Sequence, residues 1–291
     1  MLHCIVVGYS TWDKVKTLLS QLTALQGLVH QTHYVDNLGD EMVKQEVSSL
    51  AQCNYYTWGN VGYGPAINSV LKELTLDSND QYLIMNDDAL FRDNCIETLM
   101  DTYLGLKQSN EKIGIISPTF VASRPHEDSS RYFKLTGLKA KNHTRMSFGP
   151  AACWLLDYSY LEKVGGFFPP FFMYGEDLEL LNRGRMKGFS HFLVHDAIVL
   201  HDFKYPPDSK KLRLMKERNV ISAHFLNTNP NGKSPHLFAF SGLIVSFIRG
   251  HFSRLWYILL GYLQFVRRYP ELRKSKVSHQ SKVKFRYVST I

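Results

Sequence analysis

Apolar runs alternate with amphipathic stretches over the first part of the chain. Five runs have the short, continuous apolar character of buried strands, and they occupy residues 2–8, 28–37, 53–58, 81–90 and 112–118. Apolar residues at helical spacing lie between these runs, near residues 12–25, 40–51, 66–75 and 93–107. This alternation predicts an open, mostly parallel α/β sheet with right-handed crossovers.

The second part of the chain departs from this alternation. Residues 123–147 are polar and charged, and we expect a long surface excursion there. Strand character returns at 148–157 and at 189–203, on either side of an expected helix at 176–188.

Polar residues collect where the predicted strands end. Sheets of this class bind ligands at the carboxyl ends of their strands, near the point where the strand order reverses. The strand ends of this chain carry Gly8-Tyr9, Asp36-Asn37, Trp58-Gly59-Asn60 and Asn86-Asp87-Asp88. We therefore expect a ligand site along this edge of the sheet.

Two of these strand-end segments have residues that suit a metal diphosphate. A carboxylate such as Asp88, in "IMNDDAL", can hold Mg²⁺ or Mn²⁺ while diphosphate oxygens complete the coordination. An ordinary turn is the alternative, because Asn and Asp favour turns. The loop "GNVGYGPAIN" has glycines at 59, 62 and 64, which permit a positive φ and a close approach of ligand to backbone.

The stretch "FFMYGEDLELLNRGRMKG", residues 171–188, brings Glu176 and Asp177 to the start of a helix. Acids are favoured in a first helical turn by the free N–H groups and the helix dipole, so an ordinary structural role is one reading. The other reading is that Glu176 and Asp177 are catalytic carboxylates. Glu179 and Arg183 have the i, i+4 spacing of a surface ion pair. His201, at the end of the last apolar run, is either structural or a metal ligand.

Composition and charge narrow the class of protein. A hydrophobic content of 44% and a charged content of 21% fit a globular chain with a sizeable core. The four cysteines show no CxxC pairing, so we expect reduced thiols and neither a disulfide framework nor a zinc site. No secretory signal opens the sequence, and we expect a cytoplasmic protein.

Residues 267–291 hold eight Lys or Arg and one acid, which accounts for +7 of the net charge of +8. This distribution argues against nucleic acid and predicts an anionic surface contacted at one end.

Seven segments in order carry a family resemblance: "IVVGYS", "YVDN", "GNVGYGPAIN", "IMNDDAL", "GPAACWLLDYSYLEKVGGF", "FFMYGEDLELLNRGRMKG" and "VLH". Together they resemble the inverting family 2 glycosyltransferases with the GT-A fold, over residues 4 to 201. The resemblance is closest to the bacterial branch of rhamnosyltransferases and related polysaccharide-assembly enzymes. It implies a GT-A catalytic domain over residues 1–225 and a helical segment over 226–291.

The resemblance assigns roles to particular residues. Asp88 and His201 match the family's metal ligands, Asp36 matches its nucleobase contact, and Asp177 matches its catalytic base. Glu176 is expected to shape the site or to contact the acceptor. The expected nucleotide-binding residues are Gly8, Tyr9, Asp36, Asn37, Asn60, Gly62, Asn68, Asn86 and Asp87. The chain departs from the family pattern at Asn86, where an Asp is usual, and in "GGFFPPFF", which lacks the acid that often follows Gly-Gly-Phe.

The implied function is transfer of a sugar from dTDP-rhamnose or a UDP-sugar to a saccharide acceptor, which we expect to be lipid-linked, in bacterial surface polysaccharide assembly. Mg²⁺ or Mn²⁺ would be the cofactor. Two other readings stay open: a sugar-phosphate nucleotidylyltransferase and a non-catalytic nucleotide-binding scaffold.

Two apolar runs near the C-terminus, residues 237–248 and 255–266, predict two helices. Each is shorter than the ~20 residues that span a bilayer, and joining them would place Arg249 and Arg254 in hydrocarbon. We expect both helices to lie in the interface of the inner face of the cell membrane, with the basic tail against anionic lipid. The alternatives are packing on the catalytic domain or pairing between subunits of a homodimer.

Overall fold

A computed structural model of the chain describes residues 1–10, 12–25, 27–122, 133–136, 142–202, 209–226, 234–279 and 286–287. Its strands in chain order are β1 (Leu2–Gly8), β2 (Val29–Asp36), β3 (Cys53–Tyr56), β4 (Thr75–Leu76), β5 (Gln81–Asn86), β6 (Leu90–Phe91), β7 (Ile113–Val121), β8 (Lys134–Leu135), β9 (His143–Phe148), β10 (Cys153–Asp157), β11 (Ser190–Leu200) and β12 (Arg286–Tyr287). Its helices are α1 (Trp12–Ala24), α2 (Glu41–Ser49), α3 (Tyr63–Glu73), α4 (Cys95–Gln108), α5 (Tyr158–Val164), α6 (Glu176–Met186), α7 (Lys210–Leu226), α8 (Pro235–Ile248) and α9 (Phe252–His279).

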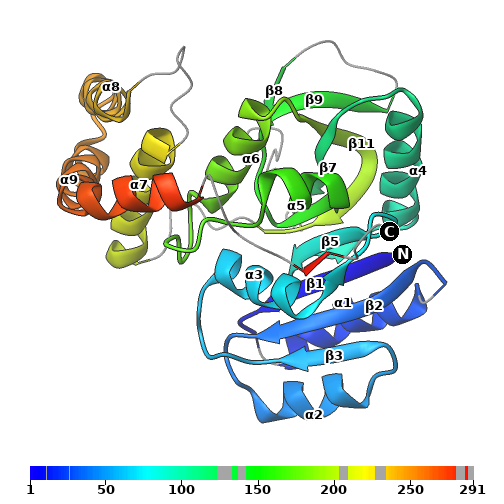
Figure 1. The fold of residues 1–291 in the computed structure, drawn as a ribbon. Helices are drawn as coiled ribbons and strands as arrows, with labels where there is room; N and C mark the ends of the chain where they lie inside the picture. Colours follow the sequence, from blue (N-terminus) through cyan, green and yellow to red (C-terminus); the bar gives the residue numbers. More distant parts are fainter. Residues whose placement is uncertain are drawn as a thin grey trace.

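The main sheet has the strand order β3-β2-β1-β5-β10-β7-β11-β9-β8, with β6 paired to β11 beside this path (Figure 1). Neighbours are parallel from β3 to β5 and again between β7 and β11, whereas β10 is antiparallel to both β5 and β7. The predicted α/β class with a largely parallel sheet is confirmed. The short strands β4 and β12 form a separate pair.

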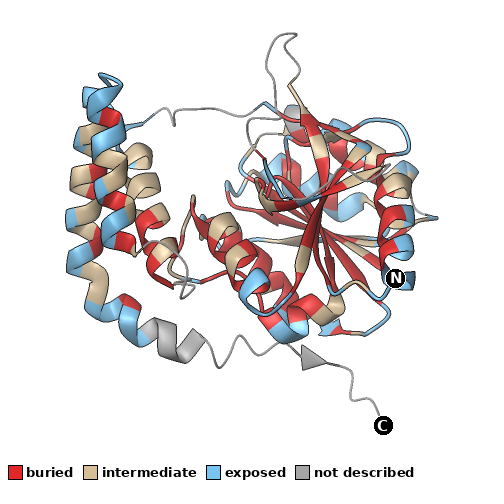
Figure 2. Ribbon diagram, turned by 90° about the horizontal axis from the view of Figure 1, so that it is seen from above, coloured by how far each residue is buried: buried red, intermediate tan, exposed pale blue. Residues whose placement is uncertain are grey.

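The centre of the sheet is a continuous core, seen as the buried strands in the middle of Figure 2. Strand β1 is apolar except for His3 near its start, because helices cover both faces of a parallel sheet. The side chains of Trp154, Tyr34 and Tyr82 are among the largest that are fully buried. All four cysteines are free thiols, as the sequence predicts.

The predicted surface excursion at 123–147 is wrong in part. Residues 143–148 form β9, which pairs antiparallel with β11 and belongs to the main sheet. The sequence does not indicate this strand, because "HTRMSF" opens with three polar residues and only Met146 and Phe148 are apolar. Residues 123–132 and 137–141 lie outside the described part of the chain.

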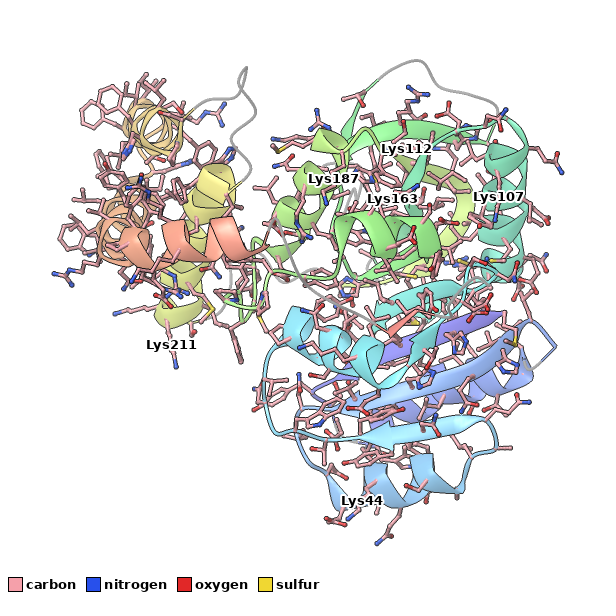
Figure 3. All side chains as sticks on the ribbon, viewed as in Figure 1. Lys44, Lys107, Lys112, Lys163, Lys187 and Lys211 are labelled. Atoms are coloured by element: carbon pink, nitrogen blue, oxygen red, sulfur yellow. The ribbon has the colours of Figure 1, made fainter. Side chains whose placement is uncertain are left out.

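The Glu179–Arg183 pair is also not the surface pair that its spacing predicts. Glu179 is 1% exposed, and Arg183 donates to both of its carboxylate oxygens at 2.8 Å. The same guanidinium donates to the carbonyl oxygens of Val164 and Gly166. The pair therefore braces the loop between α5 and α6 from inside. Nearby, Lys112 and Lys187, labelled in Figure 3, donate to carbonyls at the ends of α6 and α5.

The C-terminal helices share a second core with the sheet body. Phe168 and Phe171, from the loop before α6, pack in one buried cluster with residues of α7, α8 and α9, namely Ile221, Ala223, Phe225, Leu226, Ala239, Phe265 and Leu272. Helix α7 lies before the predicted boundary at 226, yet it belongs to this cluster. Among the described residues, none of the helices combines the length and the apolar character needed to cross a bilayer.

Candidate active site

The end of β5 and the end of β11 meet at one edge of the sheet. Strand β5 stops at Asn86, and β6 then pairs antiparallel with β11, with Leu90 opposite Leu200. This pairing brings His201 next to the turn that follows β5. The Nε2 atom of His201 lies 3.2 Å from Oδ1 of Asp88 and 3.3 Å from Nδ2 of Asn86.

Asp88 and His201 fit a divalent metal that shares its coordination with a substrate. A carboxylate oxygen and an imidazole nitrogen are both ligands for Mn²⁺ and Mg²⁺. The Asp88 side chain is 57% exposed, so its oxygens are accessible. Within the described residues no group of three or more His, Cys, Asp or Glu could hold a metal ion. The remaining ligands would therefore have to come from water or from the oxygens of a bound diphosphate.

Asp87 and Gly8 hold the neighbouring strand ends together. Asp87 is buried, and its Oδ2 accepts a hydrogen bond from the backbone N–H of Tyr9 at 3.1 Å. Burial, with the nearby charge of Asp88, raises the pKa of Asp87 to about 6. A Cβ atom on Gly8 would lie 2.0 Å from the Tyr34 hydroxyl oxygen, so only glycine fits there. Tyr9, by contrast, is exposed.

Asp36, at the end of β2, is fully buried and uses both carboxylate oxygens within the protein. Oδ1 accepts from the N–H groups of Leu38 and Gly39 at 2.8 and 2.9 Å. Oδ2 accepts from the N–H of Asp40 at 2.9 Å and from the Tyr55 hydroxyl at 3.0 Å. In this arrangement Asp36 fixes the loop that enters α2, and its nucleobase contact stays a prediction.

The glycine-rich loop packs against the segment that leads to α6. Gly62 has φ +91°, and a Cβ there would lie 2.2 Å from the Phe172 carbonyl oxygen. That carbonyl accepts the N–H of Tyr63 at 3.1 Å, while Asn37 donates to the Gly62 carbonyl at 3.4 Å. Asn60, at the loop tip, is exposed. The glycines thus serve contact between two loops of the site.

Asn68 of α3 binds the loop between α5 and α6 at Phe167. Its Nδ2 donates to the Phe167 carbonyl at 2.8 Å, and its Oδ1 accepts the Phe167 N–H at 2.9 Å. Both ends of this buried amide are bound to the loop, and its nucleotide contact stays a prediction. The structure gives Asn68 a positioning task.

Helix α7 contacts the loop that leads into α6. Asn219 is fully buried and donates to the Met173 carbonyl at 2.8 Å. Gly175, with φ +87°, lies so close to Asn219 that a Cβ would approach its backbone to 3.0 Å. Helix α6 begins at the next residue, so this clamp fixes the positions of Glu176 and Asp177.

The two acids differ in their exposure. Glu176 is buried, and its Oε2 makes no hydrogen bond, whereas Asp177 is half-buried and its Oδ1 accepts the N–H of Leu178 at 2.7 Å. Burial raises the pKa of Glu176, and the Asp177 charge raises it further. Burial also raises the pKa of Asp177, but the N–H of Leu178 and the charge of Lys216 oppose this rise.

Asp88 and the two acids at the start of α6 all act electrostatically on Tyr63. Its hydroxyl donates to the Ala151 carbonyl. Burial raises the pKa of Tyr63 well above its usual value, and the charges of Glu176, Asp177 and Asp88 add to this. Three carboxylates from two distant segments therefore lie within electrostatic reach of one hydroxyl.

Sequence analysis did not single out Tyr63, Lys216 or Asn219. Tyr63 lies inside the glycine-rich loop, from which the sequence predicts Asn60, Gly62 and Asn68 as site residues but not the tyrosine. Lys216 and Asn219 belong to α7, in a stretch with no strand-end or loop motif, and the sequence around them carries no signal of their positions.

This fold, with its strand-end edge of acids and histidine, is that of the GT-A glycosyltransferases. Three solved structures are similar to it. GalNAc-T7 with UDP, GalNAc and Mn²⁺ is 10% identical at a TM-score of 0.58, over 78% of this chain and 48% of that one, so the chain spans about half its length. The mannosyltransferase PcManGT from Pyrobaculum calidifontis, in complex with GDP-Man and Mn²⁺, is 14% identical at 0.55, over 91% and 86%. S. aureus TarS is 11% identical at 0.50, over 96% and 89%. No protein-family model and no curated protein sequence matches the chain.

Proposed function

We propose that the chain is an inverting glycosyltransferase of family 2, which moves a sugar from a nucleotide-diphosphate donor to a saccharide acceptor. The observation that carries the proposal is the meeting of Asp88 and His201, 3.2 Å apart, at the edge toward which α6 presents Asp177. Two solved structures of the same fold were obtained with nucleotide or nucleotide-sugar and Mn²⁺, which supports this reading.

Asp177 is the general base of the proposed reaction. It is half-buried and therefore reachable by an acceptor, and Lys216 favours its ionised form. The acceptor hydroxyl oxygen attacks the anomeric carbon of the donor sugar. The bond from that carbon to the diphosphate oxygen breaks, its electron pair leaves with the diphosphate, and the hydroxyl proton passes to Asp177. Attack from the face opposite the leaving group inverts the anomeric configuration.

Glu176 has a different task in this proposal. Its burial disfavours the charged form, so it is held as a neutral acid beside Asp177. A neutral neighbour leaves Asp177 as the carboxylate that accepts the proton. Glu176 would shape the site and contact the acceptor.

Asp88 and His201 would hold Mg²⁺ or Mn²⁺, which when bound supplies positive charge against the diphosphate. Asp87 keeps the turn in place through the N–H of Tyr9, so that Asp88 stays exposed beside His201. The strand ends at Gly8, Asn37, Asn60, Gly62 and Asn86 are the proposed surroundings of the nucleotide.

The finer assignments follow the sequence resemblance. The proposed donor is dTDP-rhamnose or a UDP-sugar, and the proposed acceptor is a lipid-linked saccharide at the inner face of the cell membrane, in bacterial surface polysaccharide assembly. The proposed catalytic domain is residues 1–225.

The test is calorimetric binding of UDP, dTDP and GDP to the full chain, each with and without Mn²⁺, followed by product analysis with matching nucleotide-sugars. We expect one nucleotide to bind more tightly with Mn²⁺, and Asp88→Ala to remove the Mn²⁺ effect. Sugar transfer to a saccharide supports the proposal. Release of pyrophosphate from a nucleoside triphosphate, or binding without turnover, would overturn it in favour of a nucleotidylyltransferase or a scaffold.

A further inference from the structure

Helix α8 is oriented with its small residues inward and its large apolar residues outward. Its buried residues are Pro235, Ala239 and Ser246. The exposed ones recur at helical spacing along one side: Leu237, Phe240, Ile244, Val245, Phe247 and Ile248. Phe247 is 66% and Ile248 76% exposed. An ordinary surface helix on a soluble core has the reverse orientation.

Helix α9 continues this apolar surface. Exposed Phe252, Trp256, Leu263 and Val266 follow one another at intervals that keep them on one side of the helix. The two helices touch where a Cβ on Gly242 would lie 3.4 Å from Ile258, and the rings of Phe247 and Phe252 are 6.3 Å apart at the turn. We call the exposed apolar residues of α8 and α9 the hairpin patch. It lies on the side of the molecule away from the sheet, where Figure 2 shows exposed positions along both helices.

The charges that α8, the turn and the first part of α9 contribute are basic, and among the described residues the acid that pairs with them is Glu217 of α7, whose Oε1 lies 3.8 Å from Nε of Arg254. The turn between the helices carries Arg249 and His251, and Arg254 follows in the first turn of α9. Residues 234–270 contain no Asp or Glu. The sheet body has the opposite charge balance, since residues 1–202 contain 17 Lys or Arg and 23 Asp or Glu, a net charge of −6, and its labelled lysines in Figure 3 come from several separate elements.

We propose that the hairpin patch is a docking site for an anionic lipid surface. Contiguous exposed apolar side chains of this size mark an interaction site. The apolar side chains of the hairpin patch would enter the boundary between headgroups and acyl chains, and the arginines would meet the lipid phosphates. A second copy of this chain fits less well, because the same patch on the partner would supply no acid to pair with Arg249 at the turn.

The docked helices are continuous with the candidate active site. The core under α8 and α9 contains Phe168 and Phe171, and Asn219 of α7 holds the Met173 carbonyl just before Asp177. Docking would therefore fix the acid-bearing loop with respect to the lipid surface, where a lipid-linked acceptor lies. This last step rests on the proposed function, whereas docking itself does not.

The test is co-sedimentation of the full chain with vesicles of equal parts phosphatidylglycerol and phosphatidylcholine, without nucleotide. We expect Phe247→Ser with Ile248→Ser to weaken binding by at least about 100-fold, since each loses a large apolar side chain. The matched control is Met42→Ser with Leu104→Ser, two residues of the sheet body with 58% and 50% exposure, which should bind as the parent does.

A charge variant tests the second half of the proposal. Arg249→Gln should weaken binding by roughly 5-fold, and phosphatidylcholine vesicles alone should bind far less of the parent. Arg92→Gln, on the exposed surface of the sheet body, is its control. Thermal unfolding of each variant shows whether it is folded.

Two outcomes would overturn the proposal. One is unchanged vesicle binding in the folded Phe247→Ser, Ile248→Ser variant. The other is absence of vesicle binding together with a dimer, seen by sedimentation velocity, that the same variant converts to monomer; the patch would then join two copies. Asp177→Asn should bind vesicles as the parent does, so loss of catalysis and loss of docking are separate results.

Discussion

In the sheet body most of the large apolar side chains point inward, whereas in helix α8 most of them face outward. Trp154 and Tyr160 are fully buried between strands and helices of the body. Phe240, Phe247 and Ile248 of α8 are more than half exposed although their helix is more apolar in sequence than any other. Apolar character alone therefore says that a side chain avoids water, but not which surface covers it.

One charged pair from each region shows a similar contrast. The Glu179–Arg183 pair of the body is buried, bidentate and bound to backbone carbonyls. The Arg268–Glu271 pair of α9, at 3.4 Å, lies on the surface with Glu271 64% exposed. Protein groups surround the Glu179–Arg183 pair, whereas water reaches the pair on α9.

The largest expected effect separates the catalytic task of the body from the surface task of the helices. Asp177→Asn removes the proposed base and should reduce sugar transfer by about 10²–10⁴-fold. Nucleotide affinity and vesicle binding should stay near those of the parent, because neither uses this carboxylate. Steady-state kinetics provides the measurement. Near-normal turnover would remove Asp177 from the role of base and make Glu176 the candidate.

The buried and surface ion pairs offer a matched comparison of stability. Arg183→Ala leaves Glu179 buried without its partner and should lower the free energy of unfolding by about 3–5 kcal/mol. Arg268→Ala should cost at most about 1 kcal/mol, because its pair is solvated. Urea unfolding measures both. Equal losses of unfolding free energy in the two variants would mean that burial does not make the Glu179–Arg183 pair more important for stability than the surface pair.

Asn219 joins the two regions, so its removal tests their coupling. Asn219→Ala leaves the half-buried Met173 carbonyl without its donor and should lower the free energy of unfolding by about 1–3 kcal/mol. Transfer should fall as well, since the loop before Asp177 loses a support, while vesicle binding is retained. The control is Asn182→Ala. Asn182 is a half-buried residue of α6 that accepts a long hydrogen bond, 3.5 Å, from Arg185. Intact transfer in a folded Asn219→Ala protein would show that the clamp is not needed.

The smallest effect is expected in the pH dependence of stability. The pKa of Glu176 is raised in the folded state, so between its unfolded and folded pKa values the unfolded protein binds fewer protons. Stability from this group therefore falls as pH rises through that interval and stays lower above it. Glu176→Gln lacks this loss, and its advantage over the parent should grow from acid to neutral pH in urea titrations. Parallel pH curves for the two proteins would contradict the raised pKa.

Much of the sheet could be predicted because its strands are local apolar runs. The expected strands at 2–8, 28–37 and 81–90 agree closely with β1, β2 and β5. Helix α3 begins at Tyr63, earlier than expected, because packing of Gly62 and Gly64 against Phe172 and Phe167 outweighs the low helix propensity of glycine. Long-range packing of this kind has no signature in a sequence window.

The sequence by itself determined the kinds of residues at the strand ends, the apolar character of the C-terminal helices and the placement of acids at the start of α6. Only the tertiary structure decided which of them meet. Asp88 reaches His201 because β6 pairs with β11, and Asp177 is fixed because Asn219, from a helix with no motif, holds the preceding loop. The physical reason is that strand pairing and burial are set by contacts between residues far apart in the chain, whereas sequence patterns report preferences over a few neighbouring positions.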